Sequence, residues 1–355
     1  LPTPQKYCNK LILYYKLACF EKGSNSVERR QKKVSRIAVL TSGGDAPGMN
    51  ACVRAVVRTA INEGLSIFGI QGGYEGLVEG DIIPMSMRSV SNIIQRGGTI
   101  LKTSRCETFY HKVGRKRAYD VLREWNIDGL IVIGGDGSFR GAHALCEEYR
   151  INIIGVPATI DNDIYGTDLT IGYDTAVNTA LDLIDKIRDT AESHSRLFIV
   201  EVMGREAGFI ALAVGICGGA EEILVPERRM SYEQLYEAIK VWSKAGKTSS
   251  LIVVAEGDEL GNANQIAARL KKDYNIDCRV CILGHTQRGG SPTATDRLLA
   301  SRLGYHAVLG LIEGKSDVMV GWVNNQIVFT PLEETWEKKK PLDEELLKIY
   351  KTLSR

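Results

Sequence analysis

The sequence predicts an α/β protein with two lobes, each a mainly parallel, doubly wound sheet flanked by helices. Short apolar runs alternate with amphipathic segments, and the runs are rich in Val, Ile and Leu without polar alternation. Strands that crossover helices bury on both faces require such runs. A chain of 355 residues is also too long for one small core. The expected strands cover residues 35–41, 65–70, 128–134, 151–157, 196–204, 250–257 and 280–284.

Two of these strands are followed by a glycine-rich loop and a helix. After the first strand, GGDAPGMN (residues 43–50) leads into apolar residues at helical spacing, and Gly64 stands where a C′ glycine would end the helix. The apolar face of this helix is expected to contain Val53, Val56, Val57, Ala60 and Ile61. A second strand, loop and helix unit covers residues 131–149 and contains GGDGS.

No low-complexity linker separates the two lobes. We place the domain boundary near Gly172, where the glycine-rich loops give way. Residues 34–172 with 289–338 are expected to form one domain, and residues 173–288 with 339–355 the other. Residues 1–33, which carry eight Lys or Arg and two Glu, are interpreted as a poorly ordered basic extension.

The composition argues against a nucleic-acid-binding or membrane protein. The net charge is +2, but beyond residue 33 the chain carries 37 basic and 41 acidic side chains, whereas nucleic-acid binding needs a clustered basic face. The apolar segment at 11–20 is interrupted by Lys16 and is too short to span a bilayer. Cys278 and Cys281 would point to opposite faces of a strand, so we expect no zinc and a reducing, cytoplasmic environment.

Glycine-rich loops at strand ends favour binding of a polyphosphate. Their backbone N–H groups are free of side-chain crowding and precede a helix N-terminus, which attracts negative charge. Either loop alone is equally well explained as a tight turn, but two such loops strengthen the phosphate interpretation. Neither matches the Walker A sequence or GxGxxG, which argues against a dinucleotide-dependent oxidoreductase.

The segment PATIDNDIYGTD, residues 157–168, places three aspartates directly after an apolar run. Asn, Asp and Gly form turns readily, so one interpretation is a surface loop with a solvated acidic edge. The alternative is chemical. Asp163, together with Asp136 of GGDGS, could hold Mg²⁺, which keeps several waters and takes one or two carboxylates. Asp161 would then be free to accept a proton from an attacking hydroxyl.

Several charged residues lie in or beside loops at the ends of apolar runs. Each arginine by itself is explained as a solvated surface charge, but five together favour phosphate recognition by planar guanidinium groups. His285 is either hydrogen-bonded near a strand end or in contact with a substrate, and Glu256 suits a sugar hydroxyl. The arginines are Arg105, Arg196, Arg205, Arg279 and Arg288.

From about Val34 onward the chain resembles the bacterial-type 6-phosphofructokinases. Five motifs match that family in order and spacing: TSGGDAPGMN, GGDGS, TIDND, MGREAG and GHTQRGGSP. The resemblance covers nearly the whole chain apart from residues 1–33. It implies Mg²⁺-dependent transfer of the γ-phosphoryl group of ATP to the 1-hydroxyl of fructose 6-phosphate, the committed step of glycolysis.

The resemblance also implies roles for individual residues. The implied catalytic residues are Asp161 as general base, Thr159, Arg205 and Gly44, and the implied magnesium ligands are Asp136 and Asp163. The implied nucleotide-binding residues are Gly44, Tyr74, Arg105, Cys106, Gly137, Ser138 and Gly141. Those implied at the sugar phosphate are Thr159, Asp161, Met203, Gly204, Arg205, Glu256, His285 and Arg288, with Arg196 and Arg279 from a neighbouring subunit. The active sites would therefore be shared between the subunits of a homotetramer.

A pocket for ADP or phosphoenolpyruvate is a further implication of the resemblance. Arg54 and Arg58 lie one helical turn apart, which by itself fits a solvated helix face equally well. Met87 and Ala245 stand where well-regulated members usually have basic residues, so we expect effector binding to be weakened, altered or lost. The implied effector residues are Arg54, Arg58, Arg188, Glu221 and Lys247.

Two alternatives share the same fold. Pyrophosphate-using relatives commonly have an aspartate in place of Gly137 and tend to have lysine in place of Ala158. Gly137 and the small Ala158 therefore favour ATP, although ATP-using bacterial relatives usually have glycine at the latter position. A non-catalytic regulatory subunit would be expected to lose the base or the magnesium carboxylates, whereas Asp136, Asp161 and Asp163 are all present.

Overall fold

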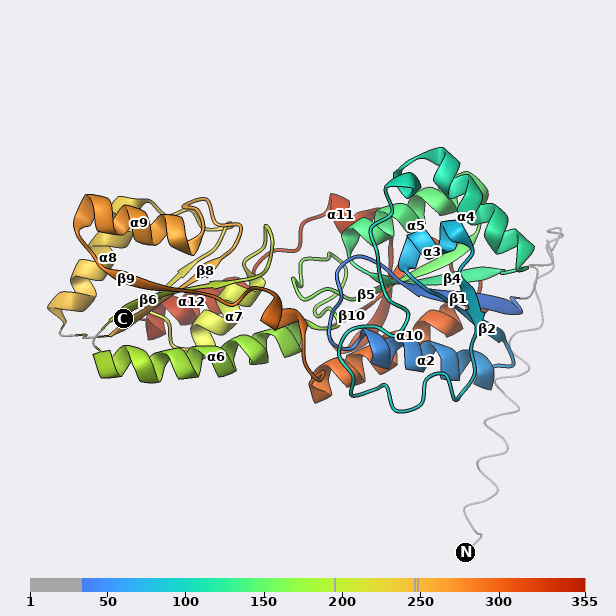
Figure 1. Ribbon diagram of the computed structural model, residues 1–355, viewed down its shortest axis with the longest axis horizontal. Coiled ribbons are helices and arrows are strands. Elements are labelled where there is room, and N and C mark those ends of the chain that lie inside the picture. The colour runs from blue at the N-terminus through green and yellow to red at the C-terminus, as the bar shows by residue number, and fades with distance from the viewer. Residues whose placement is uncertain (1–33, 195, 246, 248, 355) are drawn as a thin grey trace, which may run out of the picture. The chain divides into compact units, whose positions relative to one another are not determined.

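The computed structural model describes residues 34–194, 196–245, 247 and 249–354, so the predicted basic extension at 1–33 lies outside the described residues. Two sheets, one of seven strands and one of four, form the framework, and helices pack against both (Figure 1). The predicted α/β class is therefore confirmed. Within the described residues, no helix combines the length and apolar character needed to cross a bilayer.

The seven-stranded sheet is parallel except at its two edges. Its strands are β1 (Arg36–Thr41), β2 (Ser66–Ile70), β3 (Ile82–Pro84), β4 (Gly129–Gly134), β5 (Asn152–Pro157), β10 (Val318–Val323) and β11 (Gln326–Pro331). They lie in the order β11-β10-β5-β4-β1-β2-β3. Only the edge strands β3 and β11 run antiparallel to their neighbours.

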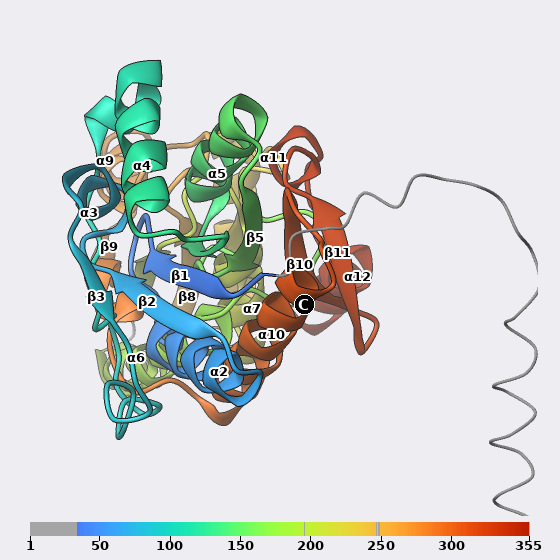
Figure 2. The same ribbon diagram turned by 90° about the vertical axis from the view of Figure 1, so that its right-hand side faces the viewer.

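Helices cover both faces of this sheet (Figure 2). The helices α2 (Met49–Asn62) and α10 (Ala294–Ile312) pack on one face, where Ile37 and Val39 of β1 point. Ala38 and Leu40 point the other way, because successive strand residues alternate between faces. That face is covered by α3 (Gly73–Glu79), α4 (Lys112–Glu124) and α5 (Asp136–Tyr149), with the short helices η1 (Glu107–Tyr110) and α11 (Glu334–Glu337) nearby.

The four-stranded sheet is entirely parallel, in the order β7-β8-β6-β9. Its strands are β6 (Leu197–Val202), β7 (Glu222–Leu224), β8 (Ser250–Ala255) and β9 (Cys278–Ile282). One face carries α6 (Tyr173–His194), α7 (Phe209–Cys217) and α12 (Glu344–Leu353), and the other carries α8 (Tyr232–Lys244) and α9 (Ala263–Tyr274). Cys281 packs toward the first face and Cys278 toward the second, so the predicted opposite orientation is confirmed.

All seven apolar runs form strands, and α2 ends as predicted, with Gly64 at a φ of 75°. The prediction for residues 280–284 was wrong at both ends: β9 starts at Cys278, and Gly284 opens the 3₁₀ helix η2 (Gly284–Arg288). Four strands were not predicted. β3 and β7 have only three residues each, whereas β10 and β11 form a hairpin through Asn324 and Asn325, whose φ values of 49° and 61° suit a tight hairpin turn. The domain boundaries stay a prediction.

Asp296 connects a helix of one sheet to a helix of the other. It lies in the first turn of α10, and only 1% of its surface is exposed. Its carboxylate accepts hydrogen bonds from the backbone N–H groups of Gly172 and Thr175, both at 2.8 Å, and from the Thr175 hydroxyl at 2.5 Å. Burial raises the pKa of Asp296, and these donors oppose that effect. The start of α6 is thereby fixed against α10.

Replacing Asp296 with Asn should lower the free energy of unfolding by about 2 kcal/mol, since one carboxylate oxygen that accepts two hydrogen bonds becomes an amide donor. Urea unfolding followed by circular dichroism measures this change. The exposed Asp185 of α6 offers a matched control, and Asp185→Asn should shift stability by less than ~0.5 kcal/mol. Equal unfolding midpoints for Asp296→Asn and the native chain would contradict this role.

Candidate functional site

A cavity of about 830 Å³ lies at the C-terminal ends of β1, β4 and β5. Both glycine-rich loops open into it, and so do Arg205 and the helix η2, which follow strands of the four-stranded sheet. Carboxyl ends of parallel strands meet at one edge, and ligands of doubly wound proteins bind there. The predicted site residues that line the cavity are Gly44, Tyr74, Arg105, Cys106, Asp136, Gly137, Ser138, Gly141, Thr159, Asp163, Arg205, His285 and Arg288.

Part of the GGDGS segment is helical, whereas the sequence analysis predicted a loop there. Gly135 is the N-cap of α5, so Asp136, Gly137 and Ser138 form the first helical turn instead of a loop. All three residues line the cavity, and the N-terminus of a helix favours an anion. A Cβ added at Gly137 would meet no atom within 4 Å, and the backbone there is not left-handed. The fold therefore does not require glycine at this position.

Asp161 is the most deeply buried charged group beside the cavity. Its surface is 1% exposed, and its Oδ2 accepts a hydrogen bond from the Thr159 hydroxyl at 3.2 Å. Within the described residues its Oδ1 has no hydrogen-bond partner. Burial raises the pKa of Asp161, whereas the guanidinium groups of Arg205 and Arg288 act in the opposite direction. The structure thus contradicts the interpretation of a solvated acidic edge for this residue.

Asp163 and Asp136 add negative charge to the same space. Burial, followed by the neighbouring charges of Asp161 and Asp136, raises the pKa of Asp163 to about 6. Like charges this close favour a cation between them, because a cation offsets both their repulsion and their desolvation. The two carboxylates fit Mg²⁺, which keeps several waters and takes one or two carboxylates, although the described residues contain no cluster of three or more side-chain metal ligands.

Arg205 connects these carboxylates from a strained backbone position. Its Nε lies 3.4 Å from Asp161 Oδ2 and its Nη1 lies 3.8 Å from Asp136 Oδ1. Its φ of 53° is in the left-handed region, which costs a non-glycine residue about 1 kcal/mol. The backbone N–H of Arg205 donates to Glu256 Oε1 at 2.8 Å and so holds this conformation.

Arg288 brings the end of η2 against the first glycine-rich loop. Its Nη1 donates to the carbonyl of Asp45 at 3.2 Å. A Cβ at Gly44 would lie 2.4 Å from that same nitrogen, so a larger residue here would displace the Arg288 guanidinium group. His285, also on η2, is exposed and lines the cavity.

Aromatic rings form another wall of the cavity. Tyr74 of α3 is buried, donates a hydrogen bond from its hydroxyl to the carbonyl of Ser138 at 2.5 Å, and stacks on Phe109 with ring centroids 4.0 Å apart. Arg105 and Cys106 precede Phe109 in the same wall. The structure thus brings together every residue implied in nucleotide binding.

The remaining residues implied in sugar binding divide into two groups. Met203, Gly204 and Glu256 directly follow β6 and β8, next to Arg205. Arg196 and Arg279 are exposed at the N-terminal ends of β6 and β9, which is the opposite end of that sheet. This chain therefore does not bring these two arginines to its own cavity.

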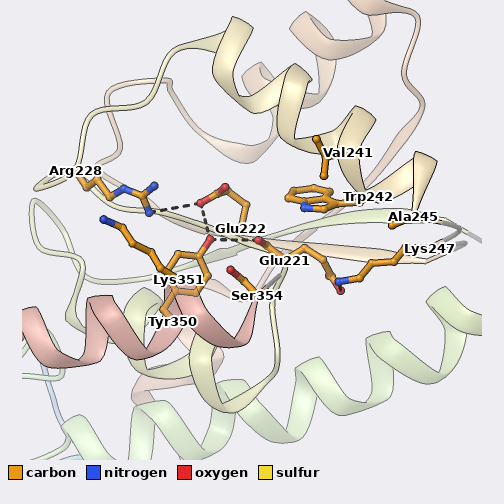
Figure 3. Close-up of a pocket in the computed structure, with 10 residues that line it drawn as sticks. All are labelled: Glu221, Glu222, Arg228, Val241, Trp242, Ala245, Lys247, Tyr350, Lys351 and Ser354. Atoms are coloured by element: carbon orange, nitrogen blue, oxygen red, sulfur yellow. Dashed lines mark hydrogen bonds and ion pairs between the residues drawn. The ribbon is translucent and has the colours of Figure 1, made fainter.

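A second pocket, of about 440 Å³, lies beside the four-stranded sheet (Figure 3). Glu221 and Lys247 line it and form an ion pair at 3.3 Å, and Ala245 lies beside them. Tyr350 of α12 donates a hydrogen bond to Glu222 Oε1 at 2.5 Å, and Trp242 forms the opposite wall. Arg54, Arg58 and Arg188 do not line this pocket. Arg188 instead donates to the carbonyls of Gly218 and Gly219.

Comparison with known proteins decides the family. Residues 36–311 match the family model described as "Phosphofructokinase". The chain belongs to the phosphofructokinase family. ATP-dependent 6-phosphofructokinase 1 of Thermus thermophilus is 53% identical over 321 residues, which cover 90% of this chain and 100% of that protein. ATP-dependent 6-phosphofructokinase 2 of Bacteroides thetaiotaomicron is 53% identical over 322 residues, with coverage of 90% and 99%.

Solved phosphofructokinase structures share the fold. The phosphofructokinase from Saccharomyces cerevisiae superposes with a TM-score of 0.80 at 37% identity. This chain spans 47% of the length of that yeast chain, with 90% of its own residues covered. The pyrophosphate-dependent phosphofructokinase from Marinobacter aquaeolei gives a TM-score of 0.78 at 24% identity, which shows the fold alone.

Some contacts in this chain were not predicted from its sequence. The buried Gln287 accepts a hydrogen bond from the backbone N–H of Met203 at 2.9 Å, and Arg115 binds Glu148 of the next helix. Asp168, the third aspartate of the acidic segment, accepts a hydrogen bond from the backbone N–H of Asn324 at 2.8 Å and so holds the β10–β11 turn. These contacts join distant segments, so no local pattern announces them.

Lys340 contacts the acidic segment at residues 157–168. Its ammonium group donates to the carbonyl of Asp168 at 2.8 Å and lies 5.1 Å from the Phe209 ring centre. Burial lowers the pKa of Lys340 to about 8, and the charges of Asp168 and Asp163 oppose this shift. Between pH 8 and about 10, the unfolded chain therefore binds more protons than the folded chain.

The free energy of unfolding should rise with pH in this range through Lys340, by up to ~1.4 kcal/mol per pH unit. Lys340→Met should abolish that contribution, while Lys339→Met, at an exposed neighbour, should retain it. Urea unfolding at pH 8, 9 and 10 compares the three proteins. If the free energy of unfolding changes with pH equally in the native chain and in Lys340→Met, then Lys340 keeps an ordinary pKa.

Proposed function

We propose that this chain transfers the γ-phosphoryl group of ATP to the 1-hydroxyl of fructose 6-phosphate, giving fructose 1,6-bisphosphate and ADP. One observation carries the proposal: Asp161, a buried carboxylate with an unbonded oxygen, lies near Arg205 and Arg288, which line the same cavity as the two glycine-rich segments. The relatives that are 50–53% identical over 90% of the chain are named ATP-dependent 6-phosphofructokinases, which supports the same reaction.

Asp161 is proposed as the general base. Its Oδ1 has no hydrogen-bond partner among the described residues, so it is free to accept the proton of the attacking sugar hydroxyl. Burial raises its pKa, which makes it a better proton acceptor, and the charges of Arg205 and Arg288 oppose this rise. Thr159 orients the carboxylate through its hydroxyl.

The charge that develops on the transferring group is proposed to be stabilised by Arg205 and by the backbone at Gly44. Phosphoryl transfer depends mainly on positioning and on electrostatic stabilisation of this kind. Asp136 and Asp163 would hold Mg²⁺, directly or through water. When bound, Mg²⁺ neutralises phosphate charge and orients the phosphate chain.

The rest of the nucleotide is proposed to fill the remainder of the 830 Å³ cavity. Backbone N–H groups at the start of α5 suit the phosphates, and the Tyr74 and Phe109 wall suits a planar base. The proposed nucleotide-binding residues are Gly44, Tyr74, Arg105, Cys106, Gly137, Ser138 and Gly141.

The sugar phosphate is proposed to bind between η2 and the loops after β6 and β8. The proposed contacts from this chain are Thr159, Asp161, Met203, Gly204, Arg205, Glu256, His285 and Arg288. Arg196 and Arg279 are exposed at the far end of the four-stranded sheet, where β9 is an edge strand. A second subunit could pair with β9, and these two arginines would then contact the active site of that subunit. A homotetramer with shared active sites is proposed on this basis.

An effector site is proposed at Arg54, Arg58, Arg188, Glu221 and Lys247. The pocket beside Glu221 has room for a small ligand, and Arg58 Nε is buried without a hydrogen-bond partner among the described residues. Ala245 adds no charge to the pocket, and Met87 is exposed, so binding of ADP or phosphoenolpyruvate is expected to be weak. The cytoplasmic location stays a prediction.

Asp161→Asn should lower the turnover number by a factor of about 10² to 10⁴, because the amide cannot accept the proton. The KM values for ATP and fructose 6-phosphate should change little, since the shape of the side chain is retained. Steady-state rates of fructose 1,6-bisphosphate formation measure the effect, with the exposed Asp185→Asn as control. Near-native turnover of Asp161→Asn would remove this residue from the role of base.

Gly137→Asp should discriminate between phosphoryl donors. The new side chain meets open space, so the variant should fold, but its carboxylate would repel the α-phosphate of ATP. The kcat/KM for ATP should fall by about tenfold or more, whereas any activity with pyrophosphate should be unchanged or higher. Gly137→Ala, which adds no charge, is the matched control and should keep most ATP activity. Equal kcat/KM for ATP in both variants would contradict the placement of the nucleotide.

A further inference from the structure

Arg115 binds the backbone of one wall of the large cavity. The η1 wall, defined as residues 104–110, carries Arg105, Cys106, Phe109 and Tyr110 into the cavity. At its C-terminal end, Arg115 Nη1 donates to the carbonyls of Phe109 at 2.9 Å and Tyr110 at 2.8 Å. The position of this end of the wall therefore depends on the position of the Arg115 guanidinium group.

Glu148 determines that placement. Arg115 Nε and Nη2 donate to the two carboxylate oxygens of Glu148 at 2.9 and 2.8 Å, which is a bidentate pair. The Arg115 side chain is 12% exposed and that of Glu148 20% exposed, so water competes little for these bonds. The pair raises the pKa of Arg115 and lowers that of Glu148, so both stay ionised. Only arginine offers enough donors in a fixed plane to bind a carboxylate and two carbonyls together.

The pair joins the two parts of the cavity that a nucleotide would have to contact at once. Glu148 lies near the C-terminal end of α5, whose first turn carries Asp136, Gly137 and Ser138. The η1 wall reaches the same turn from the other side, because Phe109 stacks on Tyr74 and the Tyr74 hydroxyl bonds to the Ser138 carbonyl. Arg115 and Tyr74 therefore join the aromatic wall to the two ends of α5, and Arg115 does so at the C-terminal end.

We infer that Arg115, held by Glu148, is a positioning residue that sets the affinity and selectivity of this site for the base and ribose of the nucleotide. The inference rests on the proposed binding of ATP in this cavity. Arg115 also lines the cavity, but its guanidinium group bonds to Glu148 and to the η1 wall and, among the described residues, to none of the proposed catalytic residues. Its loss should therefore weaken nucleotide binding without slowing the transfer step at saturating ATP.

The test compares Arg115→Met, Glu148→Gln and the double variant with the native protein. The KM for ATP should rise about tenfold in each single variant, and the double variant should be no worse than either, because both remove the same pair. The kcat and the KM for fructose 6-phosphate should stay within about twofold, and the preference for ATP over GTP should fall. Arg115→Lys, which keeps the charge without the planar fork, should be intermediate.

Arg117→Met is the matched control. Arg117 lies on the same helix but is exposed, and its ion pair with Glu124 is long, with Nη1 and Oε1 3.7 Å apart. It should change none of these constants. An unchanged KM for ATP in Arg115→Met overturns the inference, and so does an equal rise in both KM values together with a large loss of thermal stability. Calorimetric titration with Mg-ATP separates the two proposals: weaker binding by Arg115→Met supports the positioning role even if the native protein proves unable to phosphorylate fructose 6-phosphate.

Discussion

The cost of burying the Asp161 carboxylate determines how the rest of the site is arranged. An ionised group that is 1% exposed, with one oxygen unbonded, requires nearby positive charge. Arg205 and Arg288 provide it, and Arg205 reaches the carboxylate from a strained left-handed backbone that Glu256 holds in place. Asp136 and Asp163 then concentrate negative charge where a cation would neutralise it. Each of these features would be energetically unfavourable by itself, and the neighbouring features offset its cost.

The parallel sheets bring these groups together. Glycine-rich loops after β1 and β4 and the acidic segment after β5 lie at the same edge, because parallel strands present their carboxyl ends together. Arg205 and η2 arrive from the smaller sheet, and Asp296 fixes the start of α6 beside them. The fold therefore brings the two glycine-rich segments and the buried Asp161 carboxylate close to Arg205 and Arg288.

Most of the fold and the central part of the site could be predicted from the sequence, because both depend on local patterns. Buried parallel strands appear as uninterrupted apolar runs, and the glycine-rich and acidic motifs are each contiguous. Arg115 with Glu148, Gln287 with Met203, and Asp296 with Thr175 could not be predicted, since each pair forms only when distant segments pack. The first helical turn at Asp136 and the short strands β3 and β7 depend on local geometry that composition does not specify.

The most direct measurement is the rate of fructose 1,6-bisphosphate formation by the native protein from fructose 6-phosphate and Mg²⁺, with ATP and pyrophosphate offered separately. Formation of product with ATP and not with pyrophosphate is the result that this account predicts, since there is open space beside Gly137, where we propose that the α-phosphate binds. Product formed mainly with pyrophosphate would contradict the assigned donor, and no product with either donor would contradict the catalytic role of Asp161.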